Sequence, residues 1–333
     1  MFQRPDTGRR TNQERPNQQV RRRLRSHTPG RLRAFALLLA MSIAIATGAA
    51  PTMLARASET RPAGSHAPIQ SQNQPRALPP TLHIPHYDPG PLSVSDGETL
   101  TYEGSWLGIP AALATIKIHR GTRHPNAWRA GLTVTTSGVV ALIFRMQDQL
   151  SEEFDADPLS PRSLLMLNNE NRRHYSYKID FDPSKHLVTA VKTGPRSVKK
   201  RSFIADNPWG PITGSVMALS QPLHVGKSFV YDVFTGTDRY VVQLSVERHE
   251  RIHTPLGTVD ALRVAPSIPY TSNNKLRDKV RSVVVWVSAD RPRLPLRIES
   301  RIFVGWIRVD LIKVNSALAG NRGRQVARTE AAR

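Results

Sequence analysis

Apolar and polar residues alternate along most of the segment 97–314. The clearest runs are 100–106, 128–135, 175–181, 240–247 and 296–302. Such alternation is typical of strands with one face on a core and the other in water. Turn signals such as Thr193-Gly194-Pro195 and Pro255-Leu256-Gly257 follow at short intervals, which predicts an antiparallel meander. Only two stretches predict helices, Gly138 to Met146 and Ile212 to Leu219.

The first 57 residues have the parts of an export signal. Residues 21–33 hold six arginines and no acid, residues 34–50 carry no charge, and Ala55-Arg56-Ala57 forms a small-x-small cleavage site. The apolar run is slightly shorter than the ~20 residues of a spanning helix. We therefore expect cleavage after Ala57 and a periplasmic or secreted protein, with an uncleaved N-terminal membrane anchor as the alternative.

Composition suggests the remaining organisation and the partners. Residues 58–96 are rich in Pro, Ser and Gln, which predicts a disordered spacer, and residues 315–333 are predicted to form a disordered basic tail. The β-rich domain is expected at 97–314. The formal net charge is +21, and a basic exported chain favours a lipid or another anionic envelope component, or a membrane surface, over nucleic acid. With no cysteine in the chain, the core needs no disulfide.

A series of short motifs runs through the domain in order. They are GETLTYEGSWLGIPAALATIKI (97–118), FDPSK (181–185), PLHVGKSF (222–229), TPLGTVDALRV (254–264), VWVSADRPRLPLRI (285–298) and GWIRVDLIKV (305–314). The series resembles an uncharacterised envelope family, catalogued as domain of unknown function 3108. One departure is the predicted helix, where PITGSVMALSQ replaces a more polar stretch.

The resemblance implies a β-rich periplasmic fold and transfers no catalytic residue. The sheet of the family is broadly similar to the open half-barrels of lipoprotein carriers, a likeness of fold alone. Together with the alternation, this predicts a mainly β fold: an antiparallel, curved sheet or open half-barrel with one or two short helices.

Two groups of side chains are candidates for ligand contact. Aromatic residues would form a ligand wall if the sheet curls around a cavity, and otherwise they are core. Basic residues around a Gly-Pro turn would contact an anion, or would simply keep an exposed hairpin edge soluble. The aromatic group is Tyr102, Trp106, Trp128, Tyr175, Tyr177 and Phe181; the basic group is Lys192, Arg196, Lys199, Lys200 and Arg201.

Motifs that suggest an enzyme have simpler explanations here. His249-Glu250-Arg251-Ile252-His253 has the spacing of a zinc peptidase helix, but it follows a predicted strand, where residues four apart are separated by ~13 Å. Ser197–Lys200 matches S-x-x-K without its partner motifs. His83, His86 and Asp88 lie in the predicted spacer, which would offer only adventitious metal binding. We expect no catalytic residue, no metal and no cofactor.

These observations predict an exported, non-enzymatic protein that binds an apolar or amphipathic envelope molecule in its β-rich domain. The alternative is a structural or assembly factor that acts through protein contacts. A broad exposed apolar patch over a filled core would favour the alternative, and a cavity lined by the aromatic group would favour the binding protein.

Overall fold

The computed structural model describes residues 75–80, 82–92, 94–171, 173–272, 280–302 and 305–315. Within these ranges the elements follow one another in this order: β1 (Glu98–Trp106), β2 (Ile109–Arg120), β3 (Ala127–Thr136), α2 (Gly138–Ile143), β4 (Gln147–Ala156), β5 (Leu159–Glu170), β6 (Arg173–Asp182), a 3-10 turn (Pro183–Lys185), β7 (Leu187–Gly194), β8 (Ser197–Ile204), β9 (Pro208–Trp209), α3 (Pro211–Ser220), β10 (Ser228–Thr235), β11 (Asp238–Thr254), β12 (Gly257–Thr271), β13 (Val280–Ser288), β14 (Pro295–Ile302) and β15 (Trp306–Asn315).

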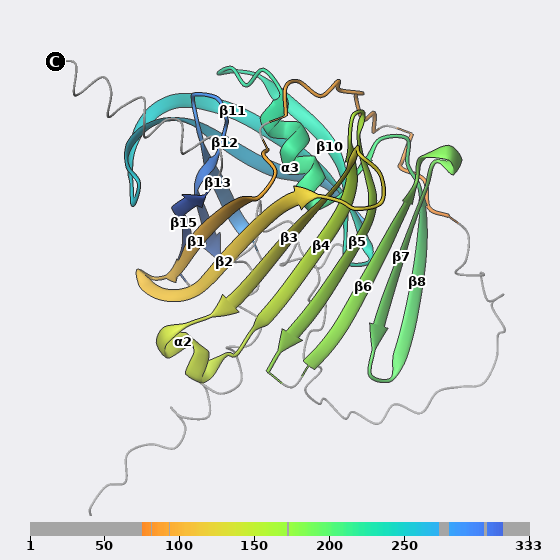
Figure 1. Cartoon of the computed structure of the whole chain (residues 1–333), viewed down its shortest axis with the longest axis horizontal. Helices are drawn as coiled ribbons and strands as arrows, with labels where there is room; N and C mark the ends of the chain where they lie inside the picture. Colours follow the sequence, from red (N-terminus) through yellow and green to blue (C-terminus); the bar gives the residue numbers. More distant parts are fainter. Residues whose placement is uncertain are drawn as a thin grey trace, which may run out of the picture.

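All fifteen strands belong to one strongly curved sheet (Figure 1). Its order is β8-β7-β6-β5-β4-β3-β2-β1-β15-β14-β13-β12-β11-β10-β9, so most neighbours in the sheet are also neighbours in sequence. Every pair is antiparallel except β9–β10, which is parallel. The connections therefore alternate between two ends of the sheet. We call them the α2 end, where the turn between β7 and β8 also lies, and the α3 end. The predicted mainly β, antiparallel, curved fold is confirmed.

Burial follows the alternation in the sequence. In β3, Trp128, Ala130, Leu132 and Val134 are buried, and Arg129 between them is exposed. The buried sides face the concave interior and form one continuous core, because the sheet bends around itself. β-Branched and aromatic residues suit this arrangement, since they pack well on a pleated, half-buried surface.

Side chains, not ladder hydrogen bonds, join the two margins of the sheet. Arg201 on β8 pairs with Asp238 at the start of β11. Phe203 packs against Phe234 on β10 with ring centroids 5.4 Å apart. Arg239 donates from Nη1 to the Ile204 carbonyl at 2.9 Å. The sheet consequently stays open as a hydrogen-bonded ladder, while side chains hold its two margins together.

The two predicted helices are present and short. The first ends at Ile143, earlier than the predicted Met146, because Phe144 already has an extended backbone. The second covers Pro211–Ser220 and lies inside the concave face of the sheet. No helix in the described ranges is long and apolar enough to cross a membrane.

The described part of the predicted spacer packs on the domain. Tyr87 contacts the rings of Phe229 and Tyr231, at centroid distances of 5.7 and 5.2 Å, and its hydroxyl accepts a hydrogen bond from Val230 N–H at 3.0 Å. Arg76 bonds to the outer edge of β8. The structure thus differs here from the expected disorder, since an aromatic anchor supplies burial that composition alone did not reveal. The predicted signal, 1–57, and the tail beyond Asn315 lie outside the described residues.

A buried ion pair between β10 and β11 positions Arg239, which also contacts the other margin of the sheet. Arg239 binds Asp232 through two parallel hydrogen bonds of 2.8 and 2.6 Å, and the two side chains are 3% and 2% exposed. Because Arg239→Met leaves a buried carboxylate unpaired, we expect the free energy of unfolding in urea to fall by about 3–5 kcal/mol. Arg239→Met combined with Asp232→Leu should be more stable than the single variant. A double variant no more stable than the single one would contradict this account.

Candidate functional site

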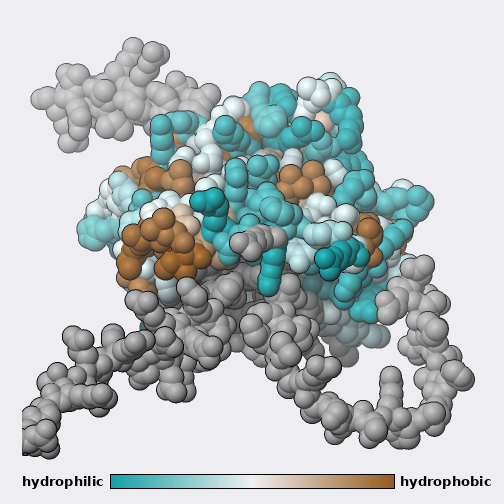
Figure 2. All heavy atoms as spheres, turned by 90° about the horizontal axis from the view of Figure 1, so that it is seen from below, coloured by the Kyte–Doolittle hydropathy of each residue, from teal (hydrophilic) through white to brown (hydrophobic). Residues whose placement is uncertain are grey.

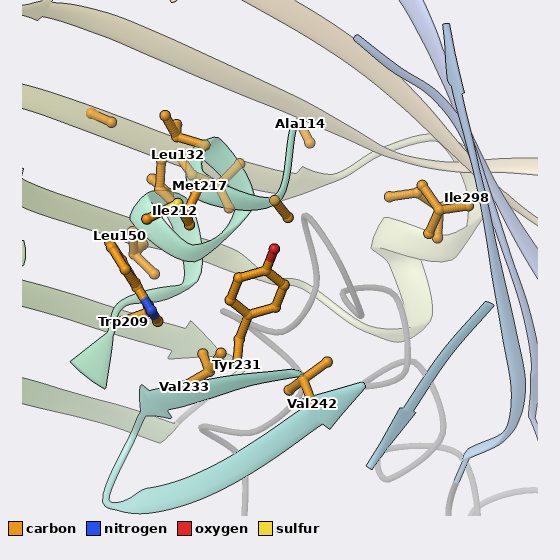
Figure 3. Packing of buried hydrophobic residues seen from close by; sticks show 14 of the residues in the cluster. Ala114, Leu132, Leu150, Trp209, Ile212, Met217, Tyr231, Val233, Val242 and Ile298 are labelled. Atoms are coloured by element: carbon orange, nitrogen blue, oxygen red, sulfur yellow. The ribbon is translucent and has the colours of Figure 1, made fainter. Parts of the chain in front are cut away.

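Helix α3 is the central feature of the concave face. Its sequence, PITGSVMALS, is apolar or small on all sides, and eight of its ten residues are buried. Figure 3 shows Ile212 and Met217 of α3 facing Leu132 and Leu150 from one wall of the sheet, while Tyr231 lies on the opposite hairpin. A helix that is apolar all round is stable in water only when it is enclosed, and the curved sheet encloses it.

The N-terminus of α3 is held by a carboxylate from the sheet. Glu152 on β4 is fully buried and accepts hydrogen bonds from the backbone N–H groups of Ile212, at 2.9 Å, and Thr213, at 3.2 Å, and one from the Thr213 hydroxyl. These N–H groups belong to the first turn, where a helix has no internal acceptors and carries a partial positive charge. Glu152 therefore does the work that a capping side chain normally does.

Gly210 explains why a distant residue provides the cap. It occupies the N-cap position without a side chain, and a Cβ there would lie 2.0 Å from Glu152 Oε1. Pro211 follows at the first helical position, where its missing N–H costs nothing. Thr213 completes the turn, because its hydroxyl oxygen accepts from Gly210 N–H at 3.1 Å. The sequence Gly-Pro-Ile-Thr thus leaves the space and provides the N–H donors that Glu152 requires.

Burial also changes the acidity of this carboxyl group. Loss of water raises the pKa of Glu152 to about 7, and the hydrogen bonds from Thr213 and Ile212 oppose the rise. A carboxyl group that is normally ionised above pH 5 therefore titrates near neutrality, at the point where α3 is attached to the sheet.

An apolar cavity of about 110 Å³ lies between α3 and the sheet. Its walls come from α3, from β1–β3 and from β11–β14, and most of the lining side chains are aliphatic. Lining residues include Leu100, Ile116, Leu132, Val216, Ala218, Leu219, Leu244, Val264, Val285 and Val287. The volume is below the ~300–1,000 Å³ of typical ligand pockets. A ligand larger than a few carbon atoms would thus require α3 to shift.

Polar groups are few in this cavity and lie at its margin. Arg293 is buried and donates from Nη1 to the Gln221 carbonyl, while its Nε has no hydrogen-bond partner among the described residues. Burial lowers the pKa of Arg293, and Arg291 adds to that effect. Glu98, whose pKa burial raises, accepts from Ser95 N–H at 2.8 Å. The unpartnered Nε is a donor available to a bound acceptor.

Of the six predicted aromatic contacts, only Tyr102 lines this cavity, with its hydroxyl donating to the Pro295 carbonyl at 3.2 Å. The others lie elsewhere in the same sheet. Trp128 packs on Phe154, Phe181 packs edge-on against Phe234, Tyr175 and Tyr177 lie beneath the Lys192 ammonium, and Trp106 is half-buried at the α2 end. Strand parity identified the face of these residues but not their position across the sheet.

The predicted basic group forms the β7–β8 hairpin at the α2 end and does not line the cavity. Arg196, Lys199 and Lys200 are exposed. Lys192 lies 4.1 Å from the centroid of the Tyr175 ring, and Arg201 pairs with Asp238. These cations are therefore separated from the apolar cavity.

The sequence motifs did not point to Glu152, Glu98 or Arg293, nor to a role of α3 in the site. One signal was present for Glu152: in SEEF it shares the buried parity of Leu150 and Phe154, which is unusual for an acid. For Arg293, within a loop, no periodicity gives such a signal.

The His-Glu-x-x-His motif lies on β11, as predicted, and its residues are engaged along the strand. His253 Nδ1 is 2.8 Å from Thr258 Oγ1, and Glu250 accepts hydrogen bonds from Trp286 Nε1 and Arg248. The described residues include no group of three or more His, Asp or Glu arranged to hold a metal ion. In the predicted spacer, His86 Nδ1 lies 3.0 Å from Asn207 Oδ1, and His86 Nε2 lies 3.6 Å from Asp88 Oδ1.

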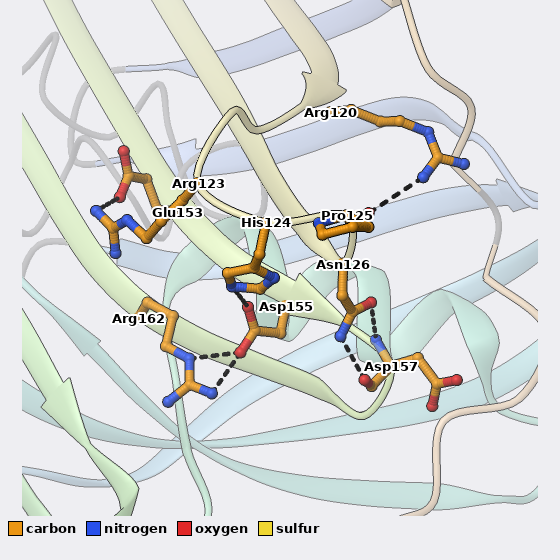
Figure 4. A network of polar contacts seen from close by, with 9 residues as sticks. All are labelled: Arg120, Arg123, His124, Pro125, Asn126, Glu153, Asp155, Asp157 and Arg162. Carbon is orange, nitrogen blue, oxygen red and sulfur yellow. Dashed lines mark hydrogen bonds and ion pairs between the residues drawn. The ribbon is translucent and has the colours of Figure 1, made fainter.

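A second, polar pocket of about 520 Å³ lies at the α3 end, around the loop 121–126 (Figure 4). Arg123 and Arg129 both pair with Glu153, and Arg162 and His124 both contact Asp155. Three arginines pair with two carboxylates in this network, so the arginines outnumber the acids. These ion pairs hold the loop 121–126 against β3, β4 and β5, and each of the charged side chains named here has a partner within the network.

The fold and the site define an open, strongly curved antiparallel sheet that encloses a buried helix and an apolar cavity. The chain belongs to the family described as protein of unknown function (DUF3108), whose model matches residues 101–312. The family resemblance predicted from the motifs is thereby confirmed.

Three solved structures match about two thirds of this chain. One is a beta-barrel-like protein of domain of unknown function DUF1849 from Brucella abortus, with 9% identity, a TM-score of 0.46, and coverage of 66% of this chain and 96% of that one. A protein described as exported, with a YmcC-like fold, from Bacteroides fragilis has 10% identity, a TM-score of 0.28, and coverage of 69% and 99%. A protein described as a lipoprotein from Parabacteroides distasonis has 10% identity, a TM-score of 0.28, and coverage of 69% and 100%. No functionally curated protein matches the chain.

The raised pKa of Glu152 predicts how stability changes with pH. The unfolded chain loses this proton near pH 4.3, while the folded protein holds it to about pH 7. Folding therefore takes up a proton between these values, and the contribution of Glu152 to stability is lost as the pH rises through this window. We expect the difference in unfolding free energy between wild type and Glu152→Gln to fall by about 3 kcal/mol from pH 4.5 to 7. Urea titrations at several pH values measure it, and parallel pH profiles would contradict the assignment.

Proposed function

We propose that the protein is exported and binds an apolar or amphipathic envelope molecule in the concave face of its sheet, without catalysing a reaction. The observation that carries the proposal is the apolar cavity between α3 and the sheet, with the unpartnered Nε of Arg293 at its margin. Apolar walls favour an acyl-like chain, and a single buried donor favours an acceptor at one end of that chain.

The size of the cavity indicates how such a molecule would enter. The cavity of about 110 Å³ is too small for a long chain, so α3 would move aside and release its volume. Hydrogen bonds to Glu152 hold the first turn of α3, whereas most of the remaining contacts of the helix are apolar. Each CH₂ group of an acyl chain that is buried in place of α3 would contribute about 0.8 kcal/mol of binding free energy. This contribution would offset the apolar contacts that the helix loses.

Export and the absence of catalysis rest on the sequence. The Arg-rich segment, the uncharged run 34–50 and Ala55-Arg56-Ala57 support export. The location of His249 and His253 on an extended strand supports a non-enzymatic role, because a zinc site with this spacing needs a helix. The basic net charge supports an anionic partner in the envelope.

The test compares one substitution on opposite faces of the sheet. Ala218 lines the cavity, while Ala265 follows the cavity-lining Val264 on β12 and so lies on the opposite face. We expect Ala218→Phe to weaken binding of a fluorescent long-chain fatty acid about tenfold or more by filling the cavity, and Ala265→Phe to leave it unchanged.

Both variants must first show the wild-type unfolding transition. Solvent extraction of the protein purified from its native envelope should in addition yield a lipid-like molecule. Equal affinities for the two variants would refute the site. No binding of the fatty acid, together with no extracted lipid, would refute the function and leave the assembly factor as the better hypothesis.

A further inference from the structure

Several large apolar side chains are exposed to solvent at the α2 end. Helix α2 exposes Val139, Leu142 and Ile143, at 59%, 87% and 69% of their surface. Next to it, Leu107 and Ile109 around the β1–β2 turn are 47% and 48% exposed, and Trp306 at the start of β15 is 36% exposed. We call these six residues the apolar tip.

Backbone contacts bring the parts of the apolar tip together. Ser137 N–H donates to the Ala111 carbonyl at 2.9 Å, which joins the α2 loop to the start of β2. Leu107 N–H donates to the Trp306 carbonyl at 3.1 Å, which joins the β1–β2 turn to β15. Figure 2, which views this end directly, shows a hydrophobic cluster at the position of α2.

Packing of α2 does not explain this exposure. The helix has six residues, buries only Val140 and lacks a side-chain cap at Ser137. It therefore gains little from the core while it presents its other apolar side chains outward. Clusters of this kind on a folded protein commonly mark an interaction site.

Charge is distributed unevenly between the two ends of the sheet. In the described turns at the α2 end, the acids are Glu170 and Asp238, and both are buried. Exposed acids in turns are found at the α3 end, namely Asp157, Asp206 and Asp290, and one further exposed acid, Glu103, lies on β1 four residues before the turn at the α2 end. Exposed cations lie at the α2 end, Arg145 and Arg301 near the apolar tip and the others on the β7–β8 hairpin, and we call them the basic rim: Arg145, Arg196, Lys199, Lys200 and Arg301.

We propose that the α2 end docks on an anionic lipid bilayer, with the apolar tip inserted in the interface and the basic rim on the headgroups. Apolar side chains combined with a cationic surround are the two contributions that hold peripheral proteins on anionic membranes. The proposal is independent of ligand binding in the concave face.

The geometry favours a bilayer over other occupants. The cations extend from α2 to the β7–β8 turn, four strand spacings away, or roughly 19 Å at ~4.8 Å per strand. The flat, negatively charged surface of a bilayer can contact cations that are spread over this distance. A second copy of the chain would place two basic rims against each other, and their repulsion opposes that contact.

Because the chain has no cysteine, one introduced thiol can report on one position. The full chain carrying Leu142→Cys is labelled with an environment-sensitive fluorophore and mixed with vesicles. We expect emission to shift to shorter wavelength with phosphatidylglycerol–phosphatidylcholine vesicles but not with phosphatidylcholine alone. Leu256→Cys is the control, since Leu256 is an exposed leucine in the β11–β12 turn at the α3 end and should show no shift.

Two further measurements separate a bilayer from the other occupants. Arg145→Gln and Arg301→Gln should each weaken the vesicle response at position 142 about fivefold, and added salt should weaken it further. The proposal is overturned if position 142 responds equally to both vesicle types or to neither. It is also overturned if the response depends on protein concentration without vesicles, as expected for a second copy, or appears only with a soluble acidic protein.

Discussion

The attachment of α3 to Glu152 is the constraint on which the interior of this protein depends. A sheet of this length has to fill the volume that its curvature encloses, and α3 fills much of it with side chains that would be insoluble outside. Glu152 supplies the acceptors that the first turn of the helix lacks, in a place that water does not reach. The buried carboxyl group is costly to ionise, so the same contact that positions the helix is sensitive to pH near neutrality.

The two margins of the sheet are not joined by ladder hydrogen bonds, and this determines how the interior is built. A barrel closed by hydrogen bonds would fix every strand, whereas here the margins meet through Arg201–Asp238, Phe203–Phe234 and the hydrogen bond from Arg239 to the Ile204 carbonyl. The core is consequently formed by side chains from strands far apart in the sequence together with one helix. A cavity beside α3 is a natural consequence, because a cylinder packed against a concave surface leaves space along its sides.

The two ends of the sheet differ in chemistry. At the α3 end, acids and bases pair closely around the loop 121–126, and the charges there maintain the structure. At the α2 end, cations are exposed around apolar side chains that have no role in the core. The interior and the α2 end are thus two separate places where apolar surface is available, and each has its own polar groups.

Sequence alone determined the class of fold, the turns, both helices and the family, because alternation, Gly-Pro signals and ordered motifs are local properties of the chain. It also showed that His249 and His253 lie on a strand. Only the tertiary structure decided which buried faces meet. Tyr102 and Tyr177 have the same kind of pattern, yet only Tyr102 borders the cavity, because curvature and strand order determine neighbours across the sheet. Likewise, Glu152 and Gly210 are 58 positions apart, and no local pattern indicates that one caps the helix which the other begins.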